Sequence, residues 1–106
     1  MTQKEIEISK LISIRIKRKD PTAKVILFGS HATGKAHNDS DWDILILINK
    51  QKKSREVEEL YRNELFELEL EIEEPISTFI FNQNDWKTKH STTPLYKNIK
   101  AEGISI

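Results

Sequence analysis

Two short apolar runs, at residues 25–28 and 44–48, constrain the fold of this chain more than any other feature. Each run is rich in branched and aromatic side chains and is too short for a helix, so each is expected to be a buried β-strand. The run at 44–48 is unbroken, which is typical of a central strand that is buried on both faces. Together the two strands would hold the polar loop 29–43 between them.

This loop carries a glycine turn at one end and two carboxylates at the other. Gly29 and Ser30 follow the first run, and Asp41 and Asp43 lie at the start of the second. Alternate side chains of a strand share a face, so the two aspartates would point the same way and need a counter-charge, usually a divalent cation. A glycine lets the backbone approach a ligand closely, and the free N–H groups at a helix start bind phosphate. The segment therefore indicates nucleotide chemistry.

The same segment resembles the signature of the polymerase-β-type nucleotidyltransferases, which is Gly-Ser, ten residues and Asp-x-Asp; residues 31–40 supply the ten here. The small stand-alone members, called minimal nucleotidyltransferases, are similar in length. Their fuller pattern is Gly-Ser-x-Ala-Arg-Gly, a variable stretch, and Ser-Asp-x-Asp-Leu. This chain has Gly-Ser-His-Ala-Thr-Gly at 29–34 and Ser-Asp-Trp-Asp-Ile at 40–44. Both halves at this spacing, each beside a strand-like run, make a specific match.

The resemblance implies roles for four residues. Asp41 and Asp43 would be the catalytic metal ligands and would hold Mg²⁺, with two ions expected when nucleotide is bound. Gly29 and Ser30 would bind the triphosphate through backbone N–H groups and the serine hydroxyl. Two divalent ions about 3.5–4 Å apart clamp the attacking and leaving oxygens of such a transfer. The implied reaction moves a nucleoside monophosphate from a nucleoside triphosphate, expected to be ATP, to a hydroxyl.

The chain departs from the family pattern at the third carboxylate, which the next core strand normally supplies. The matching strand, at 76–81, contains no acid, and Ser77 stands where the acid is expected. Glu73 and Glu74 lie just before this strand. Either they end a solvated helix, or Glu74 reaches the metal site.

For other residues of the loop, the sequence leaves alternative roles open. Thr33 replaces the usual arginine and lacks its charged fork, for which Lys35 could partly substitute. His31 and His37 are expected to be exposed turn residues rather than ligands. Trp42 should face away from the metals and pack under a helix, with base stacking as the alternative.

The remaining sequence predicts one domain over residues 1–106 with an α/β (α+β) fold, in which helices pack a small mixed β-sheet. Helices are expected over 3–19 and 30–35, from Ser54 to Pro75, in a short segment within 82–90, and from Thr93 to Gly103. Strands are expected at 24–28, 43–49 and 76–81, with a turn at 37–40 and a polar link at 50–53. The inward stripes of the two long helices would contain Ile8, Leu11, Ile12 and Ile16, and Val57, Leu60, Tyr61, Leu65, Leu68 and Ile72.

Composition excludes several classes of protein. The chain has 17 basic and 17 acidic residues, so it lacks the positive excess of a general nucleic-acid binder. With no cysteine, it has no disulfide, thiolate zinc site or cysteine nucleophile. It shows no signal peptide and no apolar run long enough to span a membrane, so a cytoplasmic protein is expected. The basic segment 15–19 and the glutamate-rich segment 56–74 are either solvated helix faces or contact surfaces.

A chain of this size leaves little room for an acceptor-binding domain, so the acceptor is expected on a partner. Small stand-alone family members often pair with a helical HEPN-type protein in toxin–antitoxin operons, where some adenylylate a tyrosine of the toxin. The resemblance implies this antitoxin role here. The alternative is a catalytically weak, nucleotide-binding antitoxin or partner-binding module, which the missing acid and arginine favour. An aminoglycoside-type transferase would need an extra helical domain.

Overall fold

The computed structural model describes residues 1–49 and 54–106, so the polar link expected at 50–53 lies outside the described residues. Its centre is a four-stranded mixed sheet with the order β3-β2-β1-β4. The strands are β1 (Lys24–Phe28), β2 (Trp42–Ile48), β3 (Ile76–Asn82) and β4 (Ile104–Ser105). β1 is antiparallel to both β2 and β4, whereas β3 is parallel to β2. The expected class, a small mixed sheet packed by helices, is confirmed.

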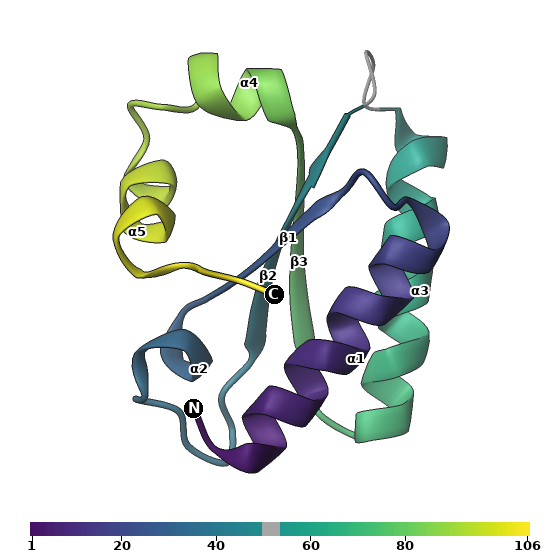
Figure 1. Cartoon of the computed structure of the whole chain (residues 1–106), viewed down its shortest axis with the longest axis vertical. Coiled ribbons are helices and arrows are strands. Elements are labelled where there is room, and N and C mark those ends of the chain that lie inside the picture. The colour runs from purple at the N-terminus through teal and green to yellow at the C-terminus, as the bar shows by residue number, and fades with distance from the viewer. Residues whose placement is uncertain (50–53) are drawn as a thin grey trace.

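The helices cover both faces of this sheet (Figure 1). On one face α1 (Gln3–Lys19) and α3 (Arg55–Ile72) lie side by side, and on the other lie α4 (Gln83–Thr88) and α5 (Pro94–Glu102). The short helix α2 (Ser30–Thr33) lies near one end of the sheet, close to the N-terminus of α1. None of the helices within 1–49 and 54–106 combines the length and the apolar surface that crossing a bilayer requires.

Strand β2 supplies the core on both faces of the sheet, as its unbroken apolar run predicts. Ile44, Ile46 and Ile48 belong to the larger cluster, which includes residues of α1 and α3. Leu45 and Leu47 point the other way, into a smaller cluster that includes residues of α4 and α5. Full burial of each such side chain stabilises the fold by about 1.5–3 kcal/mol, so β2 is the strand on which both layers depend.

Local capping explains where the helices begin and end. Ser54 and Thr93 accept hydrogen bonds from the N–H groups of Val57 and Tyr96, so they cap the two helices that were expected to start at these residues. The α3 helix ends at Ile72 because Glu73 adopts a left-handed conformation with φ of 57°. The helix therefore stops before Pro75 is reached.

The basic and acidic segments meet each other across α1 and α3. Arg15 pairs with Glu64 and Glu71, and Lys19 pairs with Glu64. Part of each charged segment is thus a contact surface within the chain itself. Surface ion pairs of this kind contribute about 0–1 kcal/mol each, so they orient the two helices more than they stabilise them.

Two residues expected on the inward stripes are exposed instead. Leu11 is 41% exposed and Leu60 is 56% exposed. Each directly precedes a buried residue, Ile12 or Tyr61, and consecutive residues lie about 100° apart around a helix. The stripe that contacts the sheet is therefore narrower than the apolar pattern suggested.

Strand β4 was not expected from the sequence, and it pairs with β1 through only two residues. Beyond it, the N–H of Ile106 donates to the carbonyl of Val25 over 3.0 Å. Two residues are too few to show the alternation by which strands are recognised. The other differences are small: β2 begins at Trp42, and α2 ends at Thr33.

Candidate functional site

The glycine turn and the second aspartate lie in direct contact at one end of the sheet. β1 and β2 are antiparallel with Phe28 opposite Asp43, so the loop between them leaves and returns at the same end. Gly29, the residue after Phe28, lies against the aspartate so closely that a Cβ there would be 2.1 Å from Asp43 Oδ2. The two ends of the sequence signature are thus brought together.

Trp42 and Asp43 are consecutive residues of β2, and their side chains point to opposite faces of the sheet. Trp42 is 1% exposed and packs in the larger core cluster, on the side of α1 and α3. Asp43 alternates with it and faces the side of α4 and α5, where it remains half-buried, while Asp41 is exposed just before the strand. Trp42 therefore faces away from the aspartates and packs under a helix, as expected.

The electrostatics of the aspartates are those of a site that favours a cation. The pKa of Asp43 is raised above its ordinary value of 3.8, first because burial disfavours its charge and second because Asp41 is a like charge nearby. His31 acts in the opposite direction and lowers the pKa of Asp43. A cation bound between the carboxylates would relieve both unfavourable effects.

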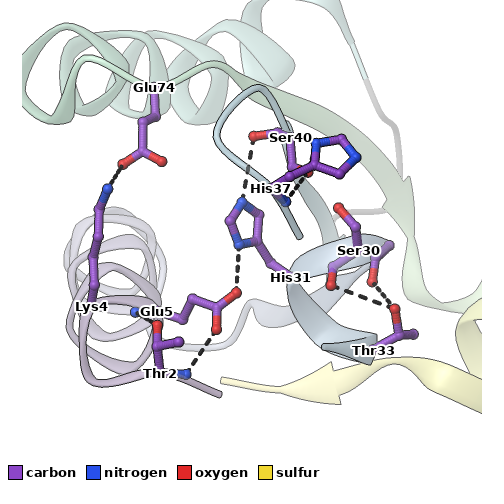
Figure 2. Close-up of polar contacts among 10 residues, drawn as sticks. Thr2, Lys4, Glu5, Ser30, His31, Thr33, His37, Ser40 and Glu74 are labelled. Atoms are coloured by element: carbon purple, nitrogen blue, oxygen red, sulfur yellow. Dashed lines mark hydrogen bonds and ion pairs between the residues drawn. The ribbon is translucent and has the colours of Figure 1, made fainter. Parts of the chain in front are cut away.

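The neighbouring strand brings Ser77 to the position beside Asp43. β3 runs parallel to β2 with Ser77 in register with Asp43, so the two side chains share a face. Glu74 turns toward α1 instead, where its carboxylate lies 3.0 Å from Lys4 Nζ (Figure 2). Within residues 1–49 and 54–106, no group of three or more His, Cys, Asp and Glu side chains is arranged to hold a metal.

Thr33 and His37 make hydrogen bonds to other residues of the same loop. The Thr33 hydroxyl donates to the carbonyl oxygen of Gly29 over 3.3 Å and so bridges the turn. His37 is exposed, as expected, and its N–H donates to Ser40 Oγ over 2.9 Å. Lys35 is also exposed.

The expectation for His31 was wrong, since this side chain is only 6% exposed. Its Nδ1 lies 2.7 Å from Glu5 Oε2 (Figure 2). Its ring stacks on Trp42 with centroids 3.7 Å apart. The loop pattern carries no signal for this burial, because Glu5 lies 26 positions away in the sequence. His31 is the residue of the site region that sequence reasoning missed.

We predict that Gly29→Ala destabilises the protein much more than Gly34→Ala. Both glycines have a positive φ, 75° and 76°, which costs a non-glycine residue about 1–3 kcal/mol. Only at Gly29 would the new methyl group also meet the Asp43 carboxylate, since nothing lies within 4 Å of a Cβ at Gly34. Urea unfolding of both variants measures the difference. Equal losses would show that the close contact with Asp43 has no energetic consequence.

We also predict that Asp43→Asn raises the free energy of unfolding of the metal-free protein near neutral pH. An acid whose pKa is raised by folding destabilises the folded state when it is ionised. The advantage of the variant should shrink as the pH falls through the raised pKa, and vanish below 3.8, where Asp43 is protonated in both states. Thermal unfolding with a chelator present tests this, with Asp39→Asn as the control in the exposed turn. A variant less stable than wild type near neutral pH would contradict it.

Comparison with known proteins agrees with this geometry. A family model described as "Polymerase beta, Nucleotidyltransferase" matches residues 9–106. No curated protein sequence matches the chain. Among solved structures, the fold is similar to a chain in a crystal structure described as a toxin–antitoxin with AMP-PNP, with a TM-score of 0.65 and 20% identity over 91% of this chain and 69% of that chain. Because the family match spans the glycine turn, the Asp-x-Asp segment and all four strands, the chain belongs to the polymerase-β nucleotidyltransferase family.

Proposed function

We propose that this protein is a Mg²⁺-dependent nucleotidyltransferase that acts on a partner protein as an antitoxin. It would move a nucleoside monophosphate from a triphosphate, expected to be ATP, to a hydroxyl of the partner. The single observation that carries the proposal is the contact between Gly29 and the Asp43 carboxylate. This contact places a turn that could bind phosphate next to the pair of carboxylates.

The residues at this point fit a hard divalent cation. Asp41 and Asp43 offer carboxylate oxygens, which Mg²⁺ prefers, and the raised pKa of Asp43 supports the need for a positive charge. Bound Mg²⁺, as a pair of ions when nucleotide is present, would supply charge stabilisation for the attacking and leaving oxygens. Gly29 and Ser30 would hold the triphosphate, because the first N–H groups of a helix have no partner within it.

In the proposed reaction, a hydroxyl oxygen of the acceptor forms a bond to the α-phosphorus as the bond to pyrophosphate breaks. The hydroxyl proton must pass to a base, and a carboxylate beside Asp43 would normally accept it. At that position this chain has Ser77, which cannot act as a base at neutral pH. Proton removal is therefore the step that this site supports least.

The fold likeness supports a partner of the toxin class. The similar solved structure is described as a toxin–antitoxin, and it contains AMP-PNP, an ATP analogue. We propose by analogy that the acceptor is a tyrosine of a helical HEPN-type toxin. The likeness is one of fold alone, so the partner must be tested directly.

A second function is favoured by the incomplete acid set. With Ser77 beside Asp43 and Glu74 paired to Lys4, the site has two carboxylates. A protein of this kind would bind metal and nucleotide but turn over slowly, and would act as an antitoxin by binding its partner. The two functions share the same nucleotide site and differ in the rate of transfer.

We predict that the double variant Asp41→Asn, Asp43→Asn loses Mn²⁺-dependent nucleotide binding, because both proposed metal ligands lose their charge. Calorimetric titration of Mn²⁺–AMP-PNP into wild type and variant measures the loss. The matched control is Asp39→Asn, which removes an exposed carboxylate from the same loop. Unchanged affinity in the double variant would remove the metal role from these residues.

We further predict that Ser77→Asp speeds transfer, by about a hundredfold, because it restores a base beside the metal site. Pyrophosphate release is followed with a candidate HEPN-type partner protein, and Ser77→Ala serves as the control for loss of the hydroxyl alone. Glu74→Gln should leave the rate unchanged, since Glu74 is held by Lys4. A fast wild type that is inactivated by Glu74→Gln would show instead that Glu74 is the third acid.

A further inference from the structure

A buried histidine lies behind the proposed nucleotide site and contacts two separate segments of the chain, the start of α1 and the start of β2. His31 directly follows Ser30 of the glycine turn. Its Nδ1 is 2.7 Å from Glu5 Oε2 near the start of α1, and its Nε2 is 3.4 Å from the carbonyl oxygen of Ser40. Its ring stacks on Trp42 with an interplanar angle of 5°. Figure 2 shows the imidazole between Glu5 and Ser40.

Both ring nitrogens of His31 face oxygen atoms of other residues. The Glu5 carboxylate accepts a hydrogen bond from the Nδ1–H of His31, and the Nε2 of His31 lies within 3.4 Å of the Ser40 carbonyl oxygen. The pKa of Glu5 lies below its ordinary value, chiefly because the Thr2 N–H donates to its carboxylate, with the hydrogen bond from His31 acting in the same direction. The indole of Trp42 stacks on the imidazole and holds the plane of the ring from one side.

Glu5 itself is held in place by the first turn of α1. Its Oε1 accepts the Thr2 N–H over 2.8 Å, and its own N–H donates to Thr2 Oγ1 over 3.1 Å. This capping box leaves Oε2 free to face His31. The histidine is therefore anchored to a rigid helix end rather than to a mobile side chain.

We infer that His31, oriented by Glu5, is a positioning residue for nucleotide binding. It fixes the glycine turn, which it follows, against the start of β2, where Ser40 and Trp42 flank the first aspartate. Its side chain stacks on Trp42, which packs on the face of the sheet opposite Asp43, so it acts on the site through the turn and the start of β2. This inference rests on the proposed nucleotide-binding function and adds the side chains that hold that site in shape.

The test measures affinity for Mn²⁺–AMP-PNP under conditions in which every variant is fully folded. His31→Gln and Glu5→Gln should each weaken binding about tenfold, as loss of outer-shell partners does. The double variant should be no weaker than His31→Gln, because the two residues act as one unit. His37→Gln, at the exposed histidine of the same loop, should bind like wild type.

A matched core variant separates positioning from stability. Ile16→Val removes one methylene from a fully buried residue near the other end of α1, and it should lower stability without changing the affinity. Additive losses in the double variant, or wild-type affinity in His31→Gln, would overturn the inference.

Amide hydrogen exchange tests the positioning role of His31 independently of the proposed function. In His31→Gln, the amides of residues 30–33 and 41–43 should exchange faster, while those of β3 stay unchanged. Wild-type protein that fails to bind Mn²⁺–AMP-PNP would refute the proposed function. Unchanged exchange in both loop segments would refute the positioning role, whatever the nucleotide result.

Discussion

The close approach of Gly29 to Asp43 is the contact on which the site depends. It follows from the antiparallel pairing of β1 and β2, which sets Phe28 opposite Asp43 and leaves no room for a side chain at the next position. The pairing in turn depends on β2, whose aliphatic residues are buried on both faces of the sheet. Burial of β2 by the two helical layers therefore sets the geometry of the turn and the carboxylates at its end.

This arrangement costs electrostatic free energy, which the favourable interactions of the rest of the fold must offset. Folding places Asp43 in a half-buried position near the like charge of Asp41, which raises its pKa. Part of this cost is offset by His31, which lowers the pKa of Asp43. A ligand that brings positive charge would bind the folded state selectively, and binding to the folded state alone stabilises it. Site formation and ligand binding are thus linked through charge.

The sequence predicted the parts of the fold that depend on local pattern. Strand alternation predicted that Trp42 faces away from the aspartates, and the Gly-Ser and Asp-x-Asp spacing predicted the family. Long-range contacts were not predictable in this way: His31 is buried because Glu5 meets it from a distant helix. Leu60 shows the same limit, because the apolar character of a helix residue does not say whether that residue lies within the stripe that packs on the sheet. The strand β4 was missed because two residues carry no periodicity.

The mixed pairing of the sheet has a consequence for the order in which the site assembles. β1 and β2 form a hairpin-like unit through contacts that are close in sequence, so the turn and both aspartates can meet at a small cost in loop-closure entropy. β3 joins β2 in parallel only after the chain has crossed over through α3, so Ser77 reaches Asp43 through a contact of much higher sequence separation. The turn and the two carboxylates are thus joined by contacts that are local in the sequence, whereas the position of the third acid also requires the crossover through α3 and the pairing of β3 with β2.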